Sequence, residues 1–315
     1  MATKNTDQIR RLTNNVTLAG YLADIESKYG VDKNGVDYIR IRGQIQCGEE
    51  SVMTRSFTSF IKAKKADGTD SENYEKVLDW VKKAVPMTKD KENATMVKLV
   101  GSLSANDYVG SDEQLHEGTV ASMQFFNDFE EFACDLDIEG YIKSITDEER
   151  GPEDDKKPTG RKRLNLISMD FYHNALDIKN IIIPKDFVDA LEDNGYVKGA
   201  TAKMYVSWKP NEKSEVKPKT KGFGQQRVTE GKSYLEMVLT GGDIAYDEDE
   251  QEDMIITPQM CKAMLNERAS RLKELEGAGY QGSKGSSGSS APTGFGKKGS
   301  RKMSPVVDDD DDIPF

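Results

Sequence analysis

Hydrophobic and polar residues alternate with a period of two over long stretches of the chain, which is typical of half-buried β-strands. Residues 16–27, VTLAGYLADIES, show this alternation, and residues 136–147, LDIEGYIKSITD, repeat it. Gly20 matches Gly140 and Tyr21 matches Tyr141, at an offset of 120 residues. A glycine on the apolar face of a strand predicts a bend or a bulge at that position. Two strands of one kind therefore open two similar units.

The same order of elements follows in both units. In the first unit, alternation predicts strands over residues 37–47 and 51–63, and a period of 3.6 predicts a helix over residues 70–85. Two further strands are expected over residues 94–107 and 118–132. The second unit is expected to contain strands over residues 136–145, 162–172, 175–184, 200–210 and 233–246, with a short helix over residues 185–196. Five strands with a helix between the third and the fourth is the order of the OB-fold.

The chain is thus predicted to be mainly β with short helices, and to contain two tandem OB-fold-like five-stranded barrels, a C-terminal helix and a disordered tail. The expected boundaries are 1–132 for the first barrel domain, 133–256 for the second, 257–277 for the helix, 278–307 for a Gly/Ser/Lys linker and 308–315 for an acidic tip. One mixed α/β domain with an accidental repeat is the alternative.

The net charge of the 315-residue chain is -11, which by itself argues against a nucleic-acid partner. Its distribution changes that interpretation. Five of the carboxylates lie at residues 308–312 and seven more at residues 243–253, so the rest of the chain is close to neutral. The acidic balance is therefore a property of two short segments.

Aromatic and basic residues are interleaved where an OB-fold binds its ligands, on strand 2 and in the 1-2 and 4-5 connections. Unpaired bases stack on aromatic rings while cations contact the phosphates, so this combination favours single-stranded nucleic acid. Since one lysine-rich loop alone is more often just solvated, the prediction depends on the joint placement. The candidate contacts are Tyr38, Arg40, Arg42, Arg161, Lys162, Arg163, Trp208, Lys209, Lys219, Lys221, Phe223 and Arg227.

Catalysis has little support in the sequence. Neither His116 nor His173 lies at a spacing that suggests a metal site or a nucleophile and base, and no cofactor motif is complete. Cys47, Cys134 and Cys261 are far apart in the sequence and are expected to be reduced thiols. No apolar run is long enough to span a bilayer. We therefore expect a cytoplasmic protein that is not an enzyme and holds neither a metal nor a cofactor.

Residues 257–277 predict a helix, with Thr257 as N-cap and Pro258 in the first turn, that packs on a barrel or mediates self-association. The Gly-, Ser- and Lys-rich stretch that follows cannot bury enough apolar surface to fold. It is expected to be a flexible tether for the last eight residues.

Those last residues, DDDDDIPF, resemble the acidic C-terminal peptide of the single-stranded DNA-binding proteins of bacteria and their phages. The two-unit chain and its long insertions favour a phage-encoded or divergent member of that family. The resemblance implies that Phe315 and Pro314 anchor the chain on replication, recombination and repair enzymes, with Ile313 as a secondary contact. The steering charges would be those of Asp308, Asp309, Asp310, Asp311 and Asp312.

The predicted function is therefore to coat and protect single-stranded DNA, and to recruit partner enzymes through the tip. The tip is also expected to compete with DNA for the basic loops of its own molecule. Homo-oligomers are possible, and no membrane partner is expected. Two alternatives are an RNA-binding regulator of translation and an adaptor or assembly protein whose barrels bind no nucleic acid.

Overall fold

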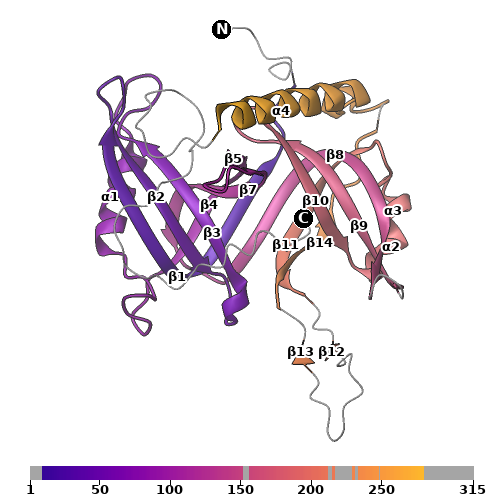
Figure 1. The fold of residues 1–315 in the computed structure, drawn as a ribbon, viewed down its shortest axis with the longest axis horizontal. Coiled ribbons are helices and arrows are strands. Elements are labelled where there is room, and N and C mark those ends of the chain that lie inside the picture. Colours follow the sequence, from indigo (N-terminus) through magenta and orange to yellow (C-terminus); the bar gives the residue numbers. More distant parts are fainter. Residues whose placement is uncertain are drawn as a thin grey trace, which may run out of the picture.

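The computed structural model describes residues 9–151, 156–211, 215–216, 229–230, 233–247 and 249–279. Its long strands form one ten-stranded sheet that closes on itself twice. The result is two barrels side by side, with helix α4 (Pro258–Ala278) lying across them (Figure 1).

Barrel 1 is a closed ring in the order β1-β2-β3-β7-β4, with β4 pairing back onto β1. Every pairing is antiparallel except that of β3 with β7. Helix α1 (Glu72–Lys83) lies between β3 and β4, and a small hairpin of β5 (Tyr108–Val109) and β6 (Leu115–His116) lies between β4 and β7. The strands of the ring are β1 (Asn14–Val31), β2 (Asp37–Gln46), β3 (Thr54–Lys62), β4 (Met96–Ala105) and β7 (Thr119–Asp128), and the short helix η2 (Ser51–Met53) precedes β3.

Barrel 2 has the same ring order, β8-β9-β10-β14-β11, closed by β11 on β8 and with β10 parallel to β14. Two short helices, α2 (Lys185–Val188) and α3 (Ala190–Asp193), occupy the position of α1. The ring strands are β8 (Ala133–Arg150), β9 (Lys157–Met169), β10 (Ala175–Ile183), β11 (Thr201–Pro210) and β14 (Leu235–Gly242). Strands β12 (Glu215–Val216) and β13 (Thr229–Glu230) pair between β11 and β14, and η3 (Glu252–Met254) precedes α4.

The predicted fold class, two tandem OB-fold-like barrels with a C-terminal helix, is therefore confirmed. The predicted tail lies outside the described residues. The three cysteines are free and buried.

The two glycines that match in the sequence repeat lie where strands approach most closely. A Cβ atom on Gly20 would lie 2.0 Å from the backbone oxygen of Gln46, and one on Gly140 would lie 2.4 Å from that of Ile167. Three residues after each glycine the pairing slips, between Leu22 and Asp24 in β1 and at the equivalent place in β8. The bend predicted from the glycines is thus present in both barrels, because only glycine leaves room for it.

The repeat also explains how the barrels join. The first halves of β1 and β8 pair antiparallel, and in that register Val16 lies opposite Leu136, its own equivalent at the offset of 120 residues. Both side chains are fully buried. The two barrels are therefore related by a local two-fold axis and share one hydrogen-bonded sheet.

Helix α4 connects the barrels a second time. Its N-cap is Thr257, whose hydroxyl oxygen accepts a hydrogen bond from the Met260 backbone at 3.2 Å. Arg268 donates to Asp107, just before the β5–β6 hairpin of barrel 1, at 2.8 Å and to the backbone oxygen of Ala175 in β10 at 3.1 Å. Of the two roles proposed for this helix, the structure shows packing on the barrels. The apolar cluster beneath it contains Ile9, Leu12, Ile167, Met169, Ala175, Ile256, Cys261 and Met264.

Candidate nucleic-acid interface

The outer face of β2 and β3 in barrel 1 carries three of the predicted contacts. Ile39 and Ile41 of β2 point into the core, so the alternation turns Tyr38, Arg40 and Arg42 outward. The register places Lys62 opposite Tyr38 and Phe60 opposite Arg40 on β3. Aromatic and cationic side chains therefore alternate across the two strands.

Phe60 is the centre of this face, and its side chain is 37% exposed. Its ring centroid lies 5.1 Å from that of Tyr38, 5.5 Å from the guanidinium carbon of Arg40 and 6.0 Å from the ammonium of Lys62. An exposed ring between two cations provides a surface for a flat aromatic group and counter-charges for an anion beside it. We call Tyr38, Arg40, Arg42, Phe60 and Lys62 the barrel 1 face.

Sequence reasoning missed Phe60 and Lys62, although their strand was predicted. The signal was the period of two within TRSFTSFIK, where Phe57, Ser59 and Ile61 are buried and the residues between them point outward. Placing these residues beside Tyr38 and Arg40 required the pairing register as well, which the sequence does not state.

The barrel 1 face carries the positive charges of Arg40, Arg42 and Lys62, and the carboxylates of Glu26 and Asp32 lie beside it. Burial lowers the pKa of the Arg42 guanidinium, and the neighbouring charge of Arg40 lowers it further, while Glu26 opposes both. An arginine remains protonated under these conditions, so Arg42 stays a cation. Lys62 donates a hydrogen bond to Asp32 in the β1–β2 turn at 2.8 Å. This hydrogen bond is the largest of the effects that lower the pKa of Asp32 to about 2.

The β5–β6 hairpin lies beside this face. Its Tyr108 and His116 rings are stacked, with centroids 5.0 Å apart and planes at 19°. Tyr108 is close enough to Arg42 to oppose, in small part, the lowering of its pKa. The hairpin is the connection between the fourth and fifth ring strands, which is one of the loops that OB-folds use for binding.

Barrel 2 has arginines at the equivalent positions, and these lie beside buried carboxylates. Arg42 lies opposite Glu26 in the register of β1 and β2, and Arg163 occupies the same place opposite Thr146 in that of β8 and β9. Arg161 precedes Arg163 by two residues, as Arg40 precedes Arg42. The predicted contacts Arg161 and Arg163 therefore correspond to Arg40 and Arg42.

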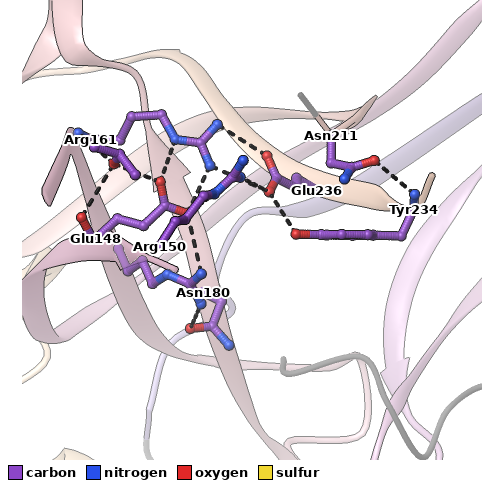
Figure 2. Close-up of polar contacts among 9 residues, drawn as sticks. Glu148, Arg150, Arg161, Asn180, Asn211, Tyr234 and Glu236 are labelled. Atoms are coloured by element: carbon purple, nitrogen blue, oxygen red, sulfur yellow. Dashed lines mark hydrogen bonds and ion pairs between the residues drawn. The ribbon is translucent and has the colours of Figure 1, made fainter. Parts of the chain in front are cut away.

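Figure 2 shows that Arg150 and Arg161 point toward two carboxylates, Glu148 and Glu236. Glu148, whose side chain has no exposed surface, accepts from Arg161 at 2.6 and 2.8 Å and from Arg163 at 3.2 Å. Glu236 accepts from Arg150 at 2.6 Å and from Arg161 at 3.1 Å. We call these five residues the barrel 2 network.

The protonation behaviour of the network follows from this geometry. Burial acts to raise the pKa of Glu148, but hydrogen bonds from Arg161 and Thr159 and the charges of Arg161 and Arg150 outweigh it and lower the pKa to about 2. The guanidinium groups are thus committed to carboxylates. Lys162, the third predicted contact in this segment, pairs with Asp147 at 2.9 Å at the exposed edge.

Trp208 lies in the core and does not join the interface. Met204, Val206 and Trp208 alternate on the inward side of β11, and Trp208 is 3% exposed. The guanidinium carbon of Arg55, from barrel 1, lies 4.7 Å from the centre of its ring. A ring enclosed in this way offers no free face to a base. Lys209, the next residue, is exposed.

The remaining predicted contacts are not placed by the structure. Lys219, Lys221, Phe223 and Arg227, and the tip from Asp308 to Phe315, lie outside the described residues. Over the described part of the chain, no group of three or more His, Cys, Asp or Glu side chains is arranged to hold a metal ion. Within the same residues, no helix is both long and apolar enough to cross a membrane.

Comparisons with solved structures find the single-stranded DNA binding protein from Thermus aquaticus. Its wild-type structure has 10% identity and a TM-score of 0.43, over 76% of this chain and 95% of that chain. A deletion mutant of that protein has 10% identity and a TM-score of 0.42, over 75% of this chain and 96% of that chain. The fold assignment above depends on the strand order and not on these two matches.

A search of curated proteins finds no match to the chain. Residues 13–276 match the protein family described as YorF. The matched region begins just before β1 and reaches the last turn of α4, so it includes both barrels and the helix across them. The chain belongs to the YorF family.

Proposed function

We propose that the protein binds single-stranded DNA, and that the barrel 1 face makes the principal contact. The observation that carries this proposal is the exposed ring of Phe60, with Tyr38 beside it and the cations of Arg40 and Lys62 on either side. Unpaired bases expose flat faces that stack on such rings, with about 1–3 kcal/mol for each base, while phosphates follow the cations.

The same face favours binding that tolerates any sequence. Rings stack on every base, because every base has a π-face. Arginine and lysine contacts to phosphates carry no sequence information. A duplex hides its base faces within the stack, so the proposal predicts a preference for single strands.

The wider role follows from the resemblance of the tip. We propose that the protein coats single-stranded DNA during replication, recombination or repair, and that residues 308–315 recruit partner enzymes. Lys209 and the loop residues Lys219, Lys221, Phe223 and Arg227 remain proposed additional contacts from barrel 2.

The test is fluorescence anisotropy with labelled poly(dT), duplex DNA and poly(U), at two salt concentrations. We expect tight, salt-dependent binding to poly(dT) and weaker binding to the other two. Replacing Phe60→Leu keeps an apolar side chain but removes the ring, so affinity for poly(dT) should fall about tenfold. Absence of binding at low salt would contradict the proposal, and stronger binding to poly(U) would favour an RNA-binding protein.

The matched control is Phe187→Leu on helix α2 of barrel 2. Phe187 is 36% exposed, almost the same as Phe60, but lies away from the barrel 1 face. Its replacement should leave binding unchanged. A label on the DNA is required because Trp208 is buried and Trp80 packs on Phe126, with ring centroids 4.7 Å apart, so neither indole lies on the proposed face.

A further inference from the structure

The turn between β9 and β10 of barrel 2 exposes two adjacent aromatic rings. Phe171 is 58% exposed and Tyr172 is 68% exposed, more than any other aromatic side chain among the described residues. The two rings meet edge to face, with centroids 5.3 Å apart and planes at 82°. Such exposure of apolar surface is unfavourable in water unless a ligand covers it.

The turn that carries these rings is held by its first residue, Asp170. One carboxylate oxygen of Asp170 accepts from the backbone of Tyr172 and of Asn174, both at 2.9 Å. The other oxygen accepts from the Asn174 side chain at 2.9 Å. Asp170 itself is buried, and His173 has a left-handed backbone with φ of 59°. The two rings therefore project from a turn of fixed shape, which lowers the entropic cost of binding to them.

A cation completes the arrangement. The guanidinium carbon of Arg11 lies 4.1 Å from the centre of the Phe171 ring. Arg11 itself is exposed. A stacking surface beside an exposed cation suits a ligand that combines flat aromatic groups with negative charge, which describes a nucleic-acid strand.

The turn also lies close to the barrel 1 face. The backbone nitrogen of Ala105, at the end of β4, donates to Asp170 at 3.4 Å. Residue 106 then begins the connection that carries the β5–β6 hairpin, and Tyr108 of that hairpin is close enough to Arg42 to influence its pKa slightly. The aromatic turn and the barrel 1 face thus flank the same hairpin.

We propose that Phe171, Tyr172 and Arg11 form a second stacking site, in barrel 2, for the single strand that binds the barrel 1 face. This inference rests on the proposed function. Barrel 2 needs a separate site because α4 covers part of its β9–β10 face, where Ile167 and Met169 are buried under Cys261 and Met264. The turn is not covered in this way, since both of its rings are more than half exposed. The neighbouring turn residues Asp170, His173 and Asn174 are polar, so the two rings do not continue into an apolar groove for a protein helix.

The test compares a short strand with a long one. A dT strand of roughly 8 nucleotides fits one OB-fold face, and a strand of roughly 30 nucleotides can reach both sites. The double replacement Phe171→Ala and Tyr172→Ala should weaken binding of the long strand about tenfold and change binding of the short strand less than about twofold. Equal weakening for both lengths, or no weakening for either, would overturn the proposal.

Two further variants separate stacking from other effects. The double replacement Phe171→Leu and Tyr172→Leu keeps the apolar character but removes both rings, so it should match the alanine variant. Recovery of wild-type affinity with leucine would point to an apolar contact and overturn the stacking site. Phe125→Ala removes a ring that is 54% exposed on β7 and should leave both lengths unaffected.

The wild-type protein tests the proposed function separately. If wild type binds neither strand, the proposed function fails and the second site fails with it. If wild type binds both strands with equal affinity, and the turn variants do the same, only the second site is overturned.

Discussion

The two barrels have the same ring order, the same glycine and bulge in their first strands, and arginines at equivalent positions of their second strands. They differ in what surrounds those arginines. In barrel 1, Arg40 lies over the ring of Phe60, which is 37% exposed. In barrel 2, Arg161 and Arg163 contact Glu148, which is fully buried. The difference shows that an equivalent position does not give an equivalent environment, because only the barrel 2 arginines surround a fully buried carboxylate.

The two barrels also differ in how far helix α4 covers the second strand of each barrel. Gln46 of β2 is half-buried, whereas its equivalent in β9, Ile167, is fully buried in the cluster beneath α4. Substitution of an amide by an aliphatic side chain creates an apolar face that a helix can cover. Barrel 2 therefore combines a stabilised second strand with a helix platform, whereas the equivalent residue of barrel 1, Gln46, stays partly exposed.

The largest expected effect is on the free energy of unfolding, and it should differ between Glu148 of barrel 2 and Glu26 of barrel 1. Glu148→Gln replaces a buried carboxylate by a neutral amide, so Arg150, Arg161 and Arg163 lose a negative counter-charge. This substitution should cost about 3–5 kcal/mol in the free energy of unfolding. Glu26→Gln, opposite Arg42 in barrel 1, should cost less than about 1 kcal/mol, because the Glu26 side chain is 60% exposed. Urea denaturation of both variants measures the two costs. Similar costs would remove the contrast between the barrels.

The next effect is on DNA binding. Arg40→Ala with Arg42→Ala should weaken binding of a dT strand by about 10- to 100-fold at low salt, and should make the slope of log affinity against log salt shallower by about 1.4. The control is Lys76→Ala with Lys82→Ala on α1, which removes the same charge from exposed positions elsewhere. An equal loss of affinity in the control would mean that net charge, and not the barrel 1 face, determines binding.

The smallest effect is the pH dependence of stability that Glu148 introduces. Its pKa is near 4.5 when unfolded and about 2 when folded, so its ionised form stabilises the fold. That stabilisation is complete above about pH 4.5 and is lost as the pH falls toward about 2. From about pH 5 to about pH 3, wild type should lose on the order of 1–2 kcal/mol more than Glu148→Gln. Parallel urea midpoints for the two proteins over that range would contradict the assignment.

Much of the fold could be predicted because its signals are local. Alternation in VTLAGYLADIES and its repeat identified the first strand of each barrel, and the change of period over residues 70–85 identified α1. The pairing of β1 with β8 and the contact of Arg268 with Asp107 could not be predicted, since the partners are far apart in the sequence and no local pattern names them.

The candidate site follows the same rule: its local features could be predicted from the sequence, and its long-range contacts could not. The outward position of Tyr38, Arg40 and Arg42 follows from alternation alone. That Arg161 contacts Glu236, 75 residues away, depends on the closed ring of barrel 2. Trp208 is a different case, because the alternation of Met204, Val206 and Trp208 already indicated an inward ring, and the basic composition of the following loop outweighed that signal.

The central claim is that single-stranded DNA lies on the barrel 1 face. Photo-crosslinking of the full chain to a dT strand that carries halogenated uracil, followed by mass spectrometry of the crosslinked peptides, tests it most directly. The account predicts crosslinks to Tyr38 and Phe60 and none to the buried Trp208. Crosslinks confined to barrel 2, with β2 and β3 unmodified, would contradict it.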